Sequence, residues 1–292
     1  MQVATMVSRV NIPEDDSIDI VRRTLNEKKH HRDFYDLITN DLVNQVRLYQ
    51  ELGGDPTSIQ PMNLRKYTDN DEDAEKRKHS LIGLYSPKEN KLPYLQLEKI
   101  RKHNGLVVCP SCGEPGRPRT LDHYLPKDKF PEFSINLLNL TPMCDWCQGE
   151  KLTEYITPDG RKRYIHPYFD DIDRPLFNIV FTPPYRAPLI AVVVRDDIPQ
   201  ELRELITLHL EGINFITRFK EFFKTRYISI LRKSHICRQP KSTFSIMASL
   251  ELLLETEIDK SINSWDAILY RSILNDHQLM QYLEQGELPE NL

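Results

Sequence analysis

Two closely spaced cysteine pairs, separated by the 31 residues 113–143, constrain this chain more than any other feature of its sequence. The first pair is Cys109 and Cys112, and the second is Cys144 and Cys147. Tetrahedral zinc needs four thiolate or imidazole ligands, and the Cys-x-x-Cys spacing lets one tight turn present two sulfur atoms. We therefore predict one structural zinc site, with a folded segment inserted between the two cysteine turns.

The expected location of the protein favours zinc ligands over disulfides for these cysteines. The 292-residue chain is 39% hydrophobic and 28% charged, which is typical of a globular protein with a real core. No apolar run reaches the roughly 18 residues that span a bilayer. Residues 1–16 lack the basic start and the apolar core of a secretory signal. We therefore expect a cytoplasmic protein without membrane contact, in which paired cysteines are metal ligands more often than disulfides.

The segment between the cysteine pairs is predicted to place two reactive side chains on one strand. Residues 120–124 can form a strand in which the neighbouring Asp122 and His123 face opposite sides. A proline-containing loop follows, residues 133–140 have a partly extended pattern, and the second cysteine pair opens a short helix. The expected order is therefore strand, loop, strand and helix.

The flanks are predicted to be helical, so we expect an α+β fold with a small mixed core in a mostly α-helical body. Apolar residues recur at spacings of three and four through residues 34–49 and again after residue 200. Two strand-like runs, 176–181 and 189–194, follow the core. The predicted regions are a helical N-terminal region 1–105, a core 106–172, a strand-containing connector 173–199 and a helical C-terminal region 200–292.

The central residues resemble the HNH endonucleases, whose ββα-metal fold is often braced by a four-cysteine zinc. The resemblance covers roughly residues 106–170 and includes both cysteine pairs. Later runs narrow it to HNH proteins that partner an ATPase in bacterial anti-phage systems of the Septu and retron-associated kind. The residues that carry it are Asp122-His123-Tyr124-Leu125-Pro126, Asn139-Leu140, Gln148-x-x-Lys151, and the runs Leu121 to Lys127, Phe130 to Phe133 and Tyr164 to Asp170.

The resemblance implies roles for five side chains. His123 would be the general base, because a neutral imidazole accepts a proton from water near neutral pH. Asp122 would bind a catalytic Mg²⁺ or Mn²⁺ through oxygen, and Asn139 would hold the loop by hydrogen bonds. Gln148 stands where the family usually has Asn or His as a second metal ligand, and its extra methylene changes the reach of the amide oxygen. Lys151 would contact a substrate phosphate.

Two further residues are candidates for the site because of where they lie in the sequence. His166 either lies beside the active site or packs beneath Tyr168, and Lys127 is predicted to bind substrate through the phosphate backbone. The net charge of −4 argues against a general nucleic-acid coat. The sequence has no recognition helix with a basic face and no aromatic stacking motif, so DNA, RNA and tRNA all stay candidate substrates.

Two classes of function follow from these observations. The first is a metal-dependent HNH endonuclease that acts as the effector subunit of an anti-phage complex, and the resemblance implies products with a 5′-phosphate and a 3′-hydroxyl. The helical flanks exceed what a minimal HNH fold needs, so we assign them to docking an ATPase partner first and to gripping substrate second. The second class is a non-catalytic, zinc-stabilised module that binds nucleic acid or protein, which Gln148 at the ligand position favours.

Overall fold

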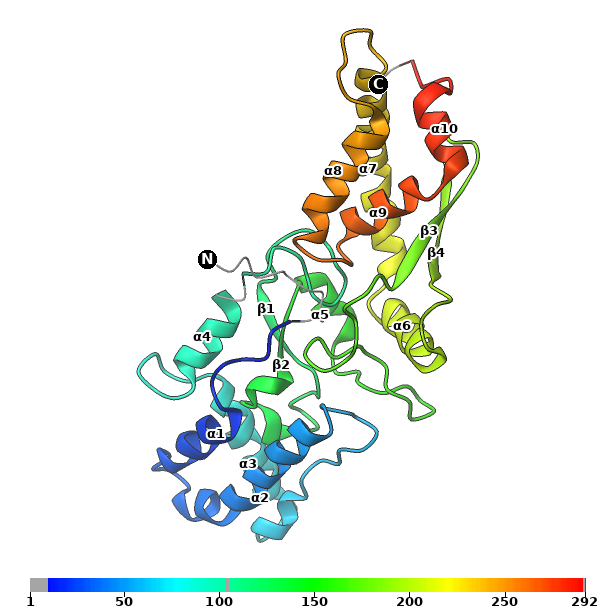
Figure 1. The fold of residues 1–292 in the computed structure, drawn as a ribbon. Helices are drawn as coiled ribbons and strands as arrows, with labels where there is room; N and C mark the ends of the chain where they lie inside the picture. Colours follow the sequence, from blue (N-terminus) through cyan, green and yellow to red (C-terminus); the bar gives the residue numbers. More distant parts are fainter. Residues whose placement is uncertain (1–9, 103–104, 291) are drawn as a thin grey trace. The chain divides into compact units, whose positions relative to one another are not determined.

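The chain folds into two compact units that interleave along the sequence. The computed structural model describes residues 10–102, 105–290 and 292. The N-terminal unit comprises residues 10–106 and 118–170, and the C-terminal unit comprises residues 107–117 and 171–292. The predicted core 106–172 therefore contributes residues to both units, although the predicted region boundaries themselves stay a prediction. Figure 1 shows the elements of each unit in sequence colours.

Helices and one small sheet make up the N-terminal unit. The α-helices and strands alternate with short 3-10 turns, labelled η. In chain order the elements are α1 (Ser17–Asn26), α2 (Arg32–Glu51), η1 (Leu64–Tyr67), α3 (Asp71–Ile82), η2 (Gly83–Tyr85), α4 (Tyr94–Lys102), β1 (Thr120–His123), η3 (Pro131–Phe133), η4 (Leu137–Asn139), β2 (Leu140–Met143) and α5 (Asp145–Lys151).

Local sequence explains where these helices begin and end. Asp16 caps α1 by accepting a hydrogen bond from the backbone N–H of Ile18, and Asn70 caps α3 in the same way. The apolar spacing through residues 34–49 becomes the buried face of α2, as predicted. Gly53 and Gly54, both at positive φ, follow the end of this helix.

The small sheet of the N-terminal unit carries the predicted Asp-His step. Strands β1 and β2 pair antiparallel, with Asp122 opposite Thr141 and His123 opposite Leu140. Leu121 and Leu140 are buried in one apolar cluster with residues of α1 and α4. The second strand differs from the prediction, because residues 133–140 mostly form the turns η3 and η4 and the extended segment begins at Leu140.

The C-terminal unit pairs a two-stranded sheet with helices. Strands β3 and β4 are antiparallel, and both predicted strand-like runs are confirmed within a residue. Helix α9 lies against β3, where the backbone N–H of Ile179 donates to Ser272 Oγ at 2.8 Å. The elements are β3 (Phe177–Thr182), β4 (Leu189–Val194), α6 (Gln200–Gly212), α7 (Phe215–Cys237), α8 (Ile246–Ile258), α9 (Trp265–Leu274) and α10 (His277–Gln285).

The first cysteine turn belongs to the C-terminal unit and is held there by helices far away in sequence. Trp265 Nε1 donates to the carbonyl of Cys112 at 2.5 Å, and His209 Nε2 donates to the carbonyl of Ser111 at 2.6 Å. Gly113 adopts φ +77°, and a Cβ at this position would lie 2.1 Å from the carbonyl oxygen of Asn263. Only glycine fits this turn, because both its backbone conformation and its close neighbour exclude a side chain.

The mixture of helices and small sheets agrees with the predicted α+β class. Within the described ranges, no helix has both the length and the apolar character needed to cross a membrane. The predicted absence of a secretory signal concerns residues 1–16, of which 1–9 lie outside the described residues. The cytoplasmic location stays a prediction.

Candidate functional site

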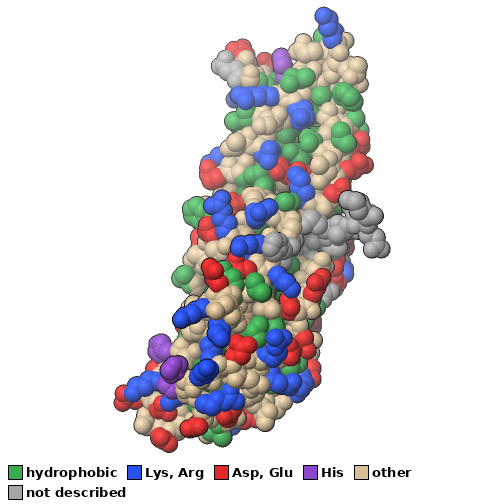
Figure 2. All heavy atoms as spheres, turned by 90° about the vertical axis from the view of Figure 1, so that its left-hand side faces the viewer, with side chains coloured by type: hydrophobic (Ala, Val, Ile, Leu, Met, Phe, Trp, Pro, Cys, Tyr) green, Lys and Arg blue, Asp and Glu red, His purple; other side chains and the backbone are tan. Residues whose placement is uncertain are grey.

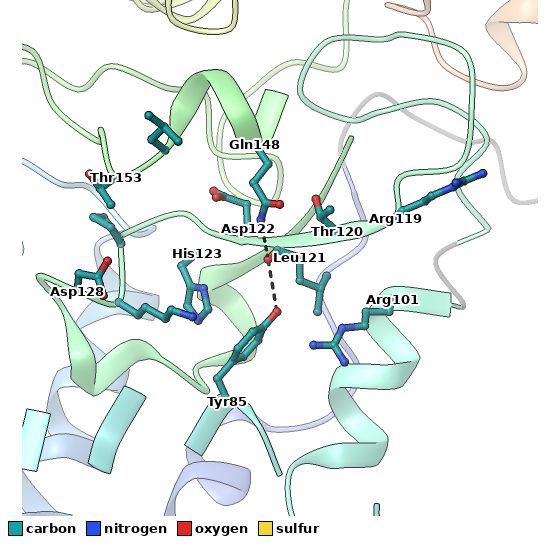
Figure 3. A pocket seen from close by; sticks show the side chains of 13 residues that line it. Tyr85, Arg101, Arg119, Thr120, Leu121, Asp122, His123, Asp128, Gln148 and Thr153 are labelled. Carbon is teal, nitrogen blue, oxygen red and sulfur yellow. Dashed lines mark hydrogen bonds between the residues drawn. The ribbon is translucent and has the colours of Figure 1, made fainter. Parts of the chain in front are cut away.

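Several predicted site residues line one pocket in the N-terminal unit. The pocket has a volume of about 440 Å³, and Figure 3 shows its walls. Strand β1 supplies Asp122 and His123, helix α5 supplies Gln148, and the loop after β1 supplies Lys127. The other lining residues are Tyr85, Arg101, Arg119, Thr120, Leu121, Pro126, Asp128, Leu152 and Thr153.

The hydrogen bond of His123 determines which ring nitrogen is available for chemistry. His123 Nε2 lies 3.0 Å from the carbonyl oxygen of Ser134. A carbonyl oxygen only accepts, so Nε2 carries the proton and Nδ1 keeps its lone pair. Burial lowers the pKa of His123 to about 3, so the ring is neutral at neutral pH. The imidazole is thus neutral and in the tautomer that a general base needs, but burial makes it a weaker proton acceptor than the free imidazole that the sequence led us to expect.

Asp122 forms a buried ion pair with Lys151. The ammonium nitrogen of Lys151 lies 2.9 Å from Oδ2 of Asp122 and donates to the carbonyl oxygen of His123 at 3.1 Å. Burial raises the pKa of Asp122, while the adjacent Lys151 acts in the opposite direction. Lys151 is 1% exposed and does not line the pocket. The contacts observed for its ammonium are with Asp122 and the carbonyl of His123. Its contact with a substrate phosphate stays a prediction.

Gln148 is oriented by the strand that it faces. Its Nε2 donates to the carbonyl oxygen of Leu121 at 3.4 Å, and the hydroxyl of Tyr85 donates to the same oxygen at 3.4 Å, as drawn in Figure 3. The amide nitrogen is therefore committed to the strand, which leaves Oε1 as the atom that can face a ligand. Asp122 and Gln148 together offer a carboxylate and an amide oxygen at one pocket, and a hard divalent cation takes such donors.

Asn139 forms hydrogen bonds to the loop that follows β1. Its Oδ1 accepts from the backbone N–H of Leu125 at 2.7 Å, and its Nδ2 donates to the carbonyls of Leu125 at 3.0 Å and Phe133 at 3.3 Å. The side chain is fully buried. These bonds fix both ends of the loop that presents Lys127 to the pocket.

His166 lies in the scaffold behind this loop. Its Nδ1 accepts from the backbone N–H of Tyr168 at 3.2 Å, so the proton is on Nε2, which donates to Tyr49 Oη at 2.9 Å. The Tyr49 hydroxyl in turn donates to Asn139 Oδ1 at 3.1 Å. The ring is fully buried and is not part of the pocket lining. This position corresponds to the packing alternative for His166, and its catalytic role stays an untested prediction.

The four cysteines gather as the sequence predicted. Their sulfur atoms all lie within 4.8 Å of one another, and tetrahedral zinc with bonds of about 2.3 Å places its sulfur ligands about 3.8 Å apart. Cys144 caps α5, because its Sγ accepts from the backbone N–H of Cys147 at 3.5 Å. The guanidinium of Arg218 lies 3.6 Å from the sulfur of Cys112 and can stabilise thiolate charge. The cluster is compatible with a structural zinc.

The predicted site did not include several of the lining residues, among them Tyr85, Arg101 and Arg119. Tyr85 and Arg101 belong to η2 and α4, well before the first cysteine. A single tyrosine or arginine at such a distance carries no local signal of a site. Only the packing of η2 and α4 beside β1 could reveal them.

Comparisons with known proteins match only parts of the chain. No family model and no solved structure matches it. One segment resembles a Septu protein. Over 81 residues the chain is 35% identical to the Septu protein PtuB of Bacillus thuringiensis. The matched segment covers 27% of this chain and 30% of PtuB. Over 62 residues it is 39% identical to protein ea31 of Escherichia phage lambda, which is 21% of each protein. The chain thus spans less than a third of the length of these curated relatives.

Proposed function

We propose that this protein is a metal-dependent HNH endonuclease that hydrolyses the phosphodiester bonds of a nucleic acid. The observation that carries the proposal is the joint placement of Asp122, His123 and Gln148 at one pocket, with strand, strand and helix in the order of a ββα-metal unit. The four-cysteine cluster beside this sequence supports the same family. The partial similarity to PtuB supports it as well.

In the proposed reaction, His123 activates the attacking water. The Nδ1 lone pair accepts a proton from water, while Nε2–H stays bonded to the carbonyl of Ser134 and holds the ring in this tautomer. His123 is only 8% exposed, so the water must approach through the pocket. The water oxygen attacks phosphorus, the bond to the 3′ oxygen breaks, and the products carry a 5′-phosphate and a 3′-hydroxyl.

The oxygens of Asp122 and Gln148 would hold a Mg²⁺ or Mn²⁺ ion, which when bound supplies positive charge to the phosphoryl and leaving oxygens. Lys151 stabilises the carboxylate of Asp122 in its charged form, which is the form that binds a cation. Lys151 also fixes the carbonyl of His123, so one ammonium orders both residues of the Asp-His step.

For its biological role we propose an effector subunit of a bacterial anti-phage defence complex that acts with an ATPase partner. The similarity to the Septu protein PtuB supports this role. We propose DNA as the substrate, with RNA or tRNA as alternatives, because the cations at the pocket suit the phosphate that all of them share.

A second candidate is a zinc-stabilised binding module without catalysis. It is favoured by Gln148 at the ligand position and by Lys151, which already neutralises the carboxylate of Asp122. The two candidates make different predictions for His123. The nuclease needs His123 to cleave a phosphodiester bond, whereas the binding module needs only its fold to bind a partner.

The deciding experiment compares purified wild type with His123→Ala in the presence of Mg²⁺ or Mn²⁺. Duplex DNA, single-stranded DNA and RNA are tested, with and without the partner. His79→Ala is the matched control, because His79 is an exposed histidine on α3 outside the pocket. We expect cleavage by wild type and the control and a loss of at least about 100-fold in His123→Ala. Equal cleavage by all three proteins would refute the assignment of His123, and binding without any cleavage would favour the second candidate.

A further inference from the structure

Basic side chains gather at the pocket although the whole chain is acidic. Arg101, Arg119 and Lys127 all line it. Arg101 pairs with Glu98 at 3.0 Å, whereas Arg119 and Lys127 have no carboxylate within ion-pair distance among residues 10–102, 105–290 and 292. On the face drawn in Figure 2, Lys and Arg side chains are interspersed with Asp and Glu, so positive charge is not spread as one broad field there. The cations at the pocket are a local feature.

Tyr85 connects these cations to the proposed general base. The guanidinium carbon of Arg101 lies 5.5 Å from the centre of the Tyr85 ring, and the ammonium of Lys127 lies 5.0 Å from it. The same ring meets His123 in an edge-on contact, with ring centres 4.5 Å apart. Its hydroxyl donates to the carbonyl of Leu121, which ties the tyrosine to β1 (Figure 3). One aromatic ring therefore contacts two of the cations and the proposed general base.

We propose that Arg101, Arg119 and Lys127 form a clamp for the nucleic-acid phosphates that flank the scissile one, with Tyr85 as the platform for Arg101 and Lys127. This inference rests on the proposed nuclease function and identifies how that site grips its substrate. A guanidinium presents a rigid fork of donors that matches phosphate oxygens, and an ammonium adds a compact charge. The cavity of about 440 Å³ lies at the small end of ligand pockets, so it admits one nucleotide unit with its phosphate.

The clamp gives part of the N-terminal helical region a direct role at the site. Tyr85 ends η2 and Arg101 lies in the last turn of α4, so both precede the HNH-like residues. Strand β1 packs against α4 through the apolar cluster that contains Leu121, Leu97 and Ile100. The same apolar contact that stabilises the sheet thus brings Arg101 to the pocket.

The test measures nucleic-acid binding in the non-cleaving His123→Ala background, without added divalent cation. Binding is titrated from about 50 to 200 mM salt. A plot of log affinity against log salt falls with a negative slope, and each lost phosphate contact makes this slope shallower by about 0.9 for duplex DNA and about 0.7 for single strands. The variants are Arg101→Gln, Arg119→Gln and Lys127→Gln. Duplex DNA, single-stranded DNA and RNA of equal length identify which nucleic acid the clamp takes.

Two controls match these variants closely. Lys102→Gln removes the other cation that pairs with Glu98, and Lys129→Gln removes a cation on the same loop that also lies 5.0 Å from a tyrosine ring, that of Tyr155. Neither residue lines the pocket. We expect each clamp variant to lower the salt slope by about one contact and each control to leave it unchanged.

Tyr85 is tested as a positioning residue by two substitutions. Tyr85→Phe keeps the ring and should retain the salt slope of the His123→Ala parent, whereas Tyr85→Leu removes the platform and should make the slope shallower as the cation variants do. A merely structural loss would reduce the amount of folded protein without changing the slope of the folded fraction.

Clamp variants with the same salt slope as their controls would overturn the clamp while leaving the nuclease proposal intact, since wild-type cleavage is measured separately. Tight, clamp-dependent binding by a protein that never cleaves would support the clamp and contradict the nuclease. Failure of the parent protein to bind any of the three nucleic acids would overturn the clamp, and the separate cleavage assay of the wild type would then decide the nuclease proposal.

Discussion

The ammonium of Lys151 lies 2.9 Å from Oδ2 of Asp122, and the two side chains are 1% and 6% exposed. A carboxylate taken out of water loses its hydration, and here the neighbouring cation compensates for that loss. Asp122 lines the pocket and Lys151 does not, so the neighbouring ammonium affects the charge of the proposed metal ligand, and loss of either partner would leave the other uncompensated. Stability and function are therefore coupled at this pair.

Removing the cation should leave an uncompensated buried carboxylate. We expect Lys151→Met to lower the free energy of unfolding at pH 7 by about 3–5 kcal/mol. The double variant Asp122→Asn/Lys151→Met should recover a large part of this loss, because no charge is then left without its partner. Urea denaturation of the wild type, the two single variants and the double variant measures the coupling energy. Additive single effects would show that the two groups do not interact.

Zinc should depend on the four clustered cysteines and not on the fifth. Metal analysis of the purified chain is expected to find one zinc per chain, and Cys147→Ser should lose it together with the cooperative thermal transition. Cys237→Ser is the matched control, because Cys237 ends α7 and lies outside the metal-compatible cluster. Wild-type protein without zinc, or Cys147→Ser protein that keeps it, would contradict the structural zinc.

Glu132 should make stability depend on pH. Burial raises its pKa to about 7, with only Oε1 bonded, to the backbone N–H of Met62 at 2.9 Å. The unfolded chain ionises near pH 4.5, whereas the folded chain holds the proton to about pH 7. The stabilising contribution is therefore complete below pH 4.5 and is lost as pH rises to about 7, a fall of about 3 kcal/mol.

The measurement is urea denaturation at several pH values between about 4 and 8. Glu132→Gln should remove this part of the pH dependence, because an amide does not ionise. The exposed Glu89→Gln is the control and should follow the wild type. A Glu132→Gln curve parallel to that of the wild type would show that Glu132 does not hold its proton in the folded chain.

Asn139 should contribute strongly to stability through the loop after β1. Asn139→Ala leaves the backbone N–H of Leu125 and two buried carbonyls without their partner, so we expect a loss of about 2–4 kcal/mol in the free energy of unfolding. Asn44→Ala, at an exposed asparagine on α2, should change it by less than about 0.5 kcal/mol. Denaturant unfolding of both variants provides the comparison, and equal effects would argue against the network.

Tyr49 distinguishes a structural from a catalytic role for His166. Tyr49→Phe removes the acceptor of His166 Nε2–H and should cost about 1–3 kcal/mol of stability without changing the cleavage rate of the folded protein. Cleavage is assayed well below the unfolding temperature. A large loss of rate in a fully folded variant would instead show that the chemistry depends on the hydrogen-bond network of Tyr49, His166 and Asn139.

Local sequence patterns were sufficient to predict several helices and strands and to place part of the candidate site on them. Apolar residues at spacings of three and four predicted α2, and two short strand-like runs predicted β3 and β4. The Asp-His step was placed on a strand correctly, whereas the second strand was expected too early, since residues 133–140 turn twice before they extend at Leu140. Turns stabilised by buried side chains such as Asn136 have no periodic signal.

The spacing of the cysteines was enough to predict that the four would meet at one site. The resemblance to HNH proteins, carried by short runs of residues, was enough to propose Asp122, His123, Asn139 and Gln148 as site residues. Only the tertiary structure decided that Lys151 pairs with Asp122, that His166 bonds to Tyr49, and that Tyr85 and Arg101 reach the pocket. These contacts join residues from separate elements, and long-range packing selects them. A local pattern carries residue types and spacing, whereas burial and partner choice depend on which surfaces fold against each other.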